Sequence, residues 1–141
     1  DSPAAQEAAQ EAGAYAIGYN SDMSSFAPKA NLTSAIWNWG PMYVKTVEEI
    51  RDGTWKGDQS TWWSMKDGVV DIAPMGAMVP DDVKSMVNAK KAELMAGNDT
   101  VFAGPVKNQA GEVAIAEGST PEDGALLGMD WFVEGVVGTT N

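Results

Sequence analysis

A carboxylate at the end of a predicted strand is the first candidate for ligand recognition. Residues 14–20 (AYAIGYN) form a short apolar run between Gly13 and the polar pair Ser21-Asp22, which is typical of a buried strand. An ionised aspartate only accepts hydrogen bonds, so Asp22 suits the vicinal hydroxyls of a sugar or the N–H of a base. A loop or helix-capping role is the alternative. We retain Asp22 as a candidate ligand-binding residue.

The tryptophans are the second group of residues that can bind a ligand. The chain contains six, at positions 37, 39, 55, 62, 63 and 131. Trp37 and Trp39 alternate about Asn38, so both are predicted to share one face of an extended segment. Their rings can stack on a planar ligand or a sugar, and they can equally serve as packing. We retain Trp37 and Trp39 as candidates.

Two further polar residues complete the candidate ligand-binding set. Asp67 lies in the turn signal Lys66-Asp67-Gly68, where it either satisfies its own backbone or belongs to a hinge or crevice loop. Ser2, before Pro3, is the predicted N-cap of a first helix, and we include Ser2 in the set. We predict no catalytic residue, no metal ligand and no cofactor. The sequence contains no glycine-rich phosphate loop and no nucleophile elbow.

The composition narrows the class of partner. The 141 residues carry a net charge of −11 and include neither histidine nor cysteine. Such an acidic chain repels nucleic acid and anionic lipid surfaces, so neither is expected as a partner. The lack of histidine removes the usual general base near neutral pH and the commonest zinc ligand. An enzyme is therefore a weaker hypothesis than a binding protein.

The order of predicted elements favours an α/β layered fold. Strands are predicted at 14–20 and 32–37, extended chain at 60–76 broken by Lys66-Asp67-Gly68, and a hairpin over 101–117. Helices are predicted after Ser2, over 41–52, from Pro80 to Leu94, and from Thr120 through Trp131, Phe132 and Val133. Gly13, Gly53 and Gly97 each suit the position after a helix end. In such folds ligands bind at the carboxyl ends of the strands, which points to the loop after Asn20.

Short motifs in a fixed order then reveal a family resemblance. They are residues 18–22 (GYNSD), 32–34 (LTS), 66–69 (KDGV), 73–74 (AP), 79–84 (VPDDVK), 104–107 (GPVK), 111–113 (GEV), 126–129 (LLGM) and 135–136 (GV). Together they resemble the C-terminal half of the basic membrane protein (BMP) family. These are extracytoplasmic, periplasmic or lipid-anchored, substrate-binding components of ABC importers.

The resemblance implies a two-lobed, hinged protein of the type I periplasmic-binding class, with parallel sheets flanked by helices. Residues 1–60 are expected in the second lobe, and residues 61–141 in the hinge crossing and return towards the first lobe. Relatives that resemble purine nucleoside receptors hold ribose with an aspartate at the position of Asp22, and aromatic rings sandwich the purine. They tend to carry a lysine where this chain has Trp37. Nucleobase and nucleoside therefore both remain open as the ligand, with an ABC permease as the expected partner.

Two other hypotheses about function remain open. One is a carboxylate-dependent enzyme that processes nucleosides or glycosides. The other is a non-catalytic assembly module. We also expect the predicted last helix, with Leu126, Leu127, Phe132 and Val133, to expose apolar surface in the isolated chain, which would favour self-association.

Overall fold

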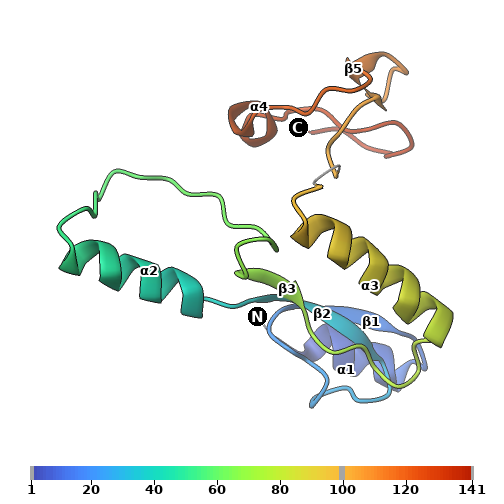
Figure 1. Cartoon of the computed structure of the whole chain (residues 1–141). Coiled ribbons are helices and arrows are strands. Elements are labelled where there is room, and N and C mark those ends of the chain that lie inside the picture. Colours follow the sequence, from blue (N-terminus) through green and yellow to red (C-terminus); the bar gives the residue numbers. More distant parts are fainter. Residues whose placement is uncertain (1, 99–100, 141) are drawn as a thin grey trace. The chain divides into compact units, whose positions relative to one another are not determined.

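The computed structural model describes residues 2–98 and 101–140. These residues divide into two compact units, Asp1–Gly97 and Asn98–Asn141. The elements, labelled in Figure 1, are α1 (Ala4–Glu11), β1 (Ala16–Asn20), β2 (Asn31–Trp37), α2 (Gly40–Arg51), β3 (Val70–Ile72), α3 (Asp81–Met95), β4 (Val106–Lys107), β5 (Val113–Ile115) and α4 (Asp123–Leu127). The mixed α/β composition agrees with the predicted fold class.

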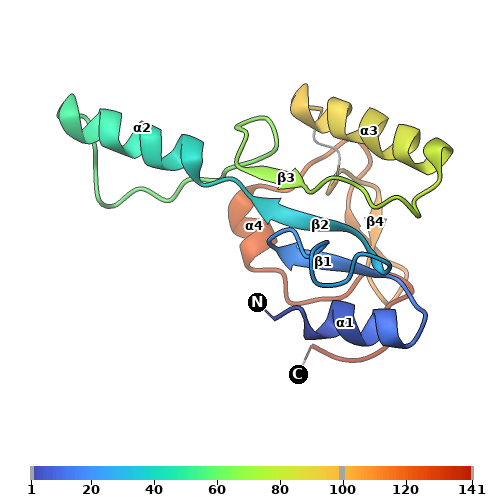
Figure 2. The ribbon, with the colours of Figure 1, turned by 90° about the horizontal axis from the view of Figure 1, so that it is seen from below.

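The first unit is built on a three-stranded sheet in the order β1-β2-β3. The resemblance implied parallel sheets, and β1 and β2 are parallel, whereas β3 departs from this by running antiparallel to β2. α1 lies beside β1 (Figure 2). Lys91 of α3 forms an ion pair with Asp71 of β3. The N-terminal end of α1 and the carboxyl ends of β1 and β2 lie at the same edge of this unit (Figure 2).

A close contact between β1 and β2 fixes their separation. Gly18 is paired with Ser34, which is fully buried. A Cβ atom at Gly18 would lie 2.2 Å from the Ser34 hydroxyl oxygen and 2.9 Å from Met23 Cγ. The same hydroxyl accepts hydrogen bonds from the Met23 backbone N–H (3.1 Å) and from Asn31 Nδ2 (3.3 Å). Position 18 therefore requires glycine, because no side chain fits between the strands.

Helix ends follow the sequence signals. Gly13, Gly53 and Gly97 adopt φ values of +67°, +71° and +83° directly after the C-caps of α1, α2 and α3. This left-handed conformation costs glycine nothing and stops each helix. Ser2 was predicted as the cap of α1, and its hydroxyl does accept a hydrogen bond from the Ala4 backbone N–H (3.2 Å), although Pro3 holds the N-cap position.

Two predicted elements are shorter in the structure. The extended chain expected over 60–76 contains only β3. The break expected at Lys66-Asp67-Gly68 is present, as a turn that Ser64 and Asp67 close. The last helix ends at Leu127 instead of continuing through Val133. Gln109 donates its backbone N–H to the Phe132 carbonyl (3.0 Å), and Glu134 donates to that of Lys107 (2.9 Å). Pairing with the β4 segment thus holds residues 132–134 out of a helix.

Candidate functional site

The carboxyl ends of β1 and β2 form an aromatic groove. Its volume is about 520 Å³, and its lining residues are Asn20, Ser21, Met23, Trp37 and Trp39. The volume lies within the range of small-molecule pockets. Met23 is buried, whereas Trp39 is 46% exposed, so the groove has an apolar base and an accessible ring. We call this the first groove.

Three aromatic rings are held in contact at this edge. The Trp37 ring meets the Tyr19 ring edge-on, with centroids 6.0 Å apart and planes at 88°. Trp37 and Trp39 are 6.5 Å apart and tilted by 41°. The two tryptophan rings are therefore neighbours, but the prediction that both lie on one face of an extended segment is wrong for Trp39. It is the helical N-cap of α2, with φ −71° and ψ −12°.

Asn20 orients Trp37. It has a φ of +70°, a conformation that asparagine tolerates better than most residues. Its side-chain Oδ1 accepts a hydrogen bond from the Trp37 indole N–H. Our sequence interpretation missed Asn20 as a site residue. The available signal was its position between an apolar run and the polar pair Ser21-Asp22, where a strand-terminal turn is expected.

Asp22 lies beside the lining residues Ser21 and Met23. It is exposed, and its Oδ1 accepts a hydrogen bond from the Ser24 backbone N–H (2.9 Å). This local bond is the capping role considered as the alternative. The bond from Ser24 occupies one of the two carboxylate oxygens of Asp22. Asp22 as a ligand-binding residue stays a prediction.

Asp67 is held within its own turn. Its Oδ2 accepts hydrogen bonds from the Ser64 hydroxyl (2.7 Å) and the Ser64 backbone N–H (2.8 Å). These two bonds, the hydroxyl first, lower the pKa of Asp67 below its ordinary value of 3.8, with Lys66 and Lys45 adding to the effect. The carboxylate is thereby stabilised in its charged form. A contact between Asp67 and a ligand stays a prediction.

Asn38 connects that turn to the aromatic segment. Its backbone N–H donates to the Val69 carbonyl (2.7 Å), and its Nδ2 donates to the Gly68 carbonyl (3.1 Å). These two hydrogen bonds hold the turn that contains Asp67 next to the segment of Trp37, Asn38 and Trp39. Ser2, which precedes α1, is exposed. Its role in ligand binding stays a prediction.

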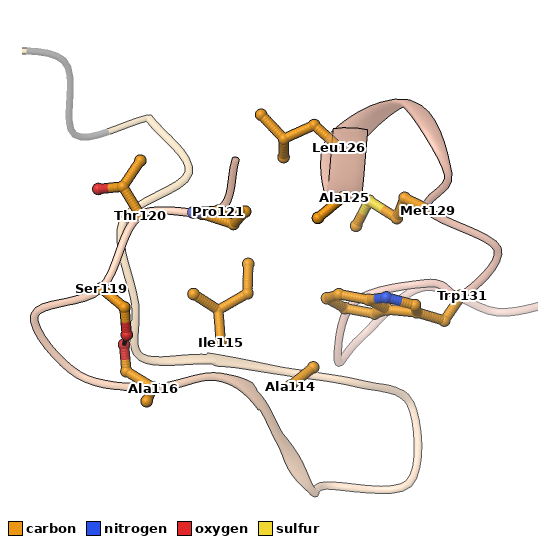
Figure 3. Close-up of a pocket in the computed structure, with 10 residues that line it drawn as sticks. All are labelled: Ala114, Ile115, Ala116, Ser119, Thr120, Pro121, Ala125, Leu126, Met129 and Trp131. Atoms are coloured by element: carbon orange, nitrogen blue, oxygen red, sulfur yellow. Dashed lines mark hydrogen bonds between the residues drawn. The ribbon is translucent and has the colours of Figure 1, made fainter. Parts of the chain in front are cut away.

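The second unit contains a different pocket. Its volume is about 280 Å³, and the side chains of Ile115, Leu126, Met129 and Trp131 face one another around it (Figure 3). The Ser119 hydroxyl at its rim donates to the Ala116 carbonyl (2.8 Å). Since this pocket is predominantly apolar, it offers little to orient a polar solute. We therefore assign the candidate site to the first groove.

Within 2–98 and 101–140, no helix is both long and apolar enough to cross a membrane. No cluster of three or more histidine, cysteine or acidic residues in these ranges has the arrangement of a metal site.

Comparison with known proteins identifies the family. A sequence profile for ABC transporter substrate-binding proteins of the PnrA-like type, called Bmp, matches residues 1–99. The chain belongs to this family. The resemblance to basic membrane proteins is therefore confirmed.

Individual relatives carry names that point to different solutes. A purine-binding protein of Brucella abortus (strain 2308) is 42% identical over 136 residues, which cover 96% of this chain and 38% of that protein. A putative ABC transporter glucose-binding protein of Haloferax volcanii is 34% identical over 139 residues, which cover 98% of this chain and 32% of that protein. The chain thus spans about a third of the length of these curated relatives.

A shorter match and a solved structure complete the comparison. Basic membrane protein B of Borreliella afzelii is 39% identical over 71 residues, covering 48% of this chain and 21% of that protein. The crystal structure of a transcriptional activator of the comK gene from Bacillus halodurans has a TM-score of 0.60 at 22% identity, covering 69% of this chain and 34% of that one. This structural likeness supports the fold alone.

Proposed function

We propose that this chain is part of the solute-binding component of an ABC importer, and that its solute carries a planar purine-like ring. The first groove supports the proposal most directly, because it places two indole rings at the carboxyl ends of parallel strands. Aromatic faces stack on nucleobases without requiring a particular base, and the nearby polar groups can fix the orientation of the ring. The name of the Brucella relative supports the same solute class.

In this proposal the full-length protein has two lobes that close by a hinge around the solute. The first groove forms one wall of the crevice. The protein operates outside the cytoplasm, where it delivers the solute to a membrane permease, and a lipid anchor would be compatible with that role. The ligand is a purine nucleobase or a nucleoside.

Within the proposed site, Asp22 accepts hydrogen bonds from the solute. Replacing Asp22 by alanine in the full-length protein is expected to weaken purine-ligand binding by more than about 1.5 kcal/mol, the lower value for a hydrogen bond to a charged group. Calorimetric titration provides the measurement. Asp22→Asn retains an oxygen for the Ser24 N–H, so its affinity separates loss of charge from loss of the turn.

Asp82→Ala serves as the matched control, since Asp82 is an exposed carboxylate in the first turn of α3. It is expected to bind like the unmodified protein. Unchanged affinity in Asp22→Ala would remove Asp22 from the site.

A further inference from the structure

The apolar pocket of the second unit has the size of a site for one side chain. Its volume of about 280 Å³ lies just below the range typical of pockets for drug-sized molecules. The side chains of Ile115, Leu126, Met129 and Trp131 converge on it (Figure 3). Met129 is exposed, as is Ala125, which also lines the pocket. A side chain of another molecule can therefore reach the pocket from outside.

Four carboxylates flank the lining residues in the sequence. They belong to Glu117, Glu122, Asp123 and Asp130, each of which lies within two positions of a residue that lines the pocket. All four are exposed. In the part of the chain that the structure describes, none of the four takes part in an ion pair. Lys107 is the only lysine or arginine among residues 101–140, so this negative charge is not balanced within the unit. We call these four residues the acidic rim.

An apolar pocket with a charged rim is typical of a protein-binding surface. In such surfaces an apolar side chain of the partner fills a central pocket, and the polar rim adds specificity and speeds association. Because the rim here is acidic, the complementary partner carries lysine or arginine beside its apolar side chain. A second copy of this chain is disfavoured, since each copy carries a net charge of −11.

We propose that this pocket and its acidic rim bind a basic segment of another protein, which inserts one apolar side chain. Leu127, which follows the lining residue Leu126, is 74% exposed, so further apolar surface is available to the partner. Met129 and Trp131 are residue types that are enriched in protein interfaces. The inference goes beyond solute binding, because the first groove takes no part in it.

Binding of labelled peptides to the full-length protein, measured by fluorescence anisotropy, tests the proposal. The probe is the octapeptide GRKLFKRG. Two further peptides separate its parts, because GRKGGKRG lacks the apolar side chains and GSGLFGSG lacks the charges. The probe is expected to bind most tightly of the three, and its affinity should fall as the salt concentration rises. Absence of probe binding, or equal binding of GRKGGKRG, would overturn the inference.

Two variants locate the binding surface. The triple variant Glu122→Gln, Asp123→Asn and Asp130→Asn removes charge from exposed side chains. It is expected to weaken probe binding by about threefold or more, the combined effect of three surface ion pairs. Ala125→Leu places a larger side chain in the lining of the pocket. It is expected to weaken binding by about tenfold or more, since burial of an apolar side chain contributes a factor of about 10 to 150.

Each variant has a matched control. The triple variant Glu7→Gln, Glu11→Gln and Asp82→Asn removes the same charge from exposed side chains of the first unit. Ala110→Leu adds the same bulk at an exposed alanine that does not line the pocket. Equal losses in variants and controls, or no loss in either variant, would overturn the inference. Light scattering supplies a further test, because self-association that Ala125→Leu abolishes would assign the pocket to a second copy instead.

Discussion

Replacing Trp37 by alanine is expected to weaken purine binding by the full-length protein by roughly 5- to 150-fold. Stacking of a base on an aromatic ring contributes about 1–3 kcal/mol, and Trp37 is the ring in contact with both Tyr19 and Trp39. Calorimetric titration with adenine measures the loss. The change in tryptophan fluorescence on addition of the ligand should be smaller in the same variant.

Trp37→Phe separates stacking from orientation. Phenylalanine keeps a ring but loses the indole N–H that Asn20 accepts. Its affinity is therefore expected to lie between those of Trp37→Ala and the unmodified protein. Trp62→Ala is the control for removal of an exposed indole. If Trp37→Ala keeps the full affinity and fluorescence response, and Trp39→Ala does the same, the tryptophan pair serves only packing.

Replacing Gly18 by alanine is expected to destabilise the protein by about 1–3 kcal/mol, the usual effect of overpacking a filled site. The added methyl group would have to displace the Ser34 hydroxyl, 2.2 Å away, and that hydroxyl is already bonded to Met23 and Asn31. Chemical denaturation of the full-length protein provides the measurement. The double variant Gly18→Ala with Ser34→Ala should lose less stability than the sum of the two single changes, because the hydroxyl no longer obstructs the methyl group.

Gly124→Ala is the matched control for this prediction. Gly124 lies in α4, and nothing surrounds the position of its added Cβ within 4 Å. Alanine favours helix over glycine, so the stability should stay the same or rise by up to about 1 kcal/mol. An equally stable Gly18→Ala variant would show that the strands can separate to admit the methyl group.

Local signals predicted most of the elements of this fold. Each of the helices α1, α2 and α3 ends where one glycine adopts a left-handed conformation, at Gly13, Gly53 and Gly97. A short sequence pattern is enough to predict such a residue. The orientation of β3 does not depend on such a pattern, because strand direction is set by the path of the whole chain. The end of α4 was mispredicted for a related reason. Backbone bonds from Gln109 and Glu134 to distant residues outweigh the helical pattern around Trp131.

The candidate site was only partly predictable. The strand-end rule pointed to the edge where the first groove lies and to Trp37, because carboxyl ends of parallel strands are adjacent in any sheet. Asn20 could not be assigned a partner, since its bond to Trp37 joins residues 17 positions apart. A groove lined by Lys45, Glu49, Trp55 and Trp63 was also missed. Its lining comes from both α2 and the following loop, and the approach of Lys45 to Trp63 depends on how that loop returns.

Thermal unfolding of the full-length protein with a panel of nucleobases, nucleosides and sugars tests the central claim most directly. The ligand should afterwards be recovered and analysed. A purine base or nucleoside at 100 times its Kd is expected to stabilise the folded protein by about 2.7 kcal/mol and to be recovered unaltered. If no purine in the panel stabilises the protein, the purine-binding proposal is wrong. A chemically altered purine would contradict the receptor role and favour the enzyme.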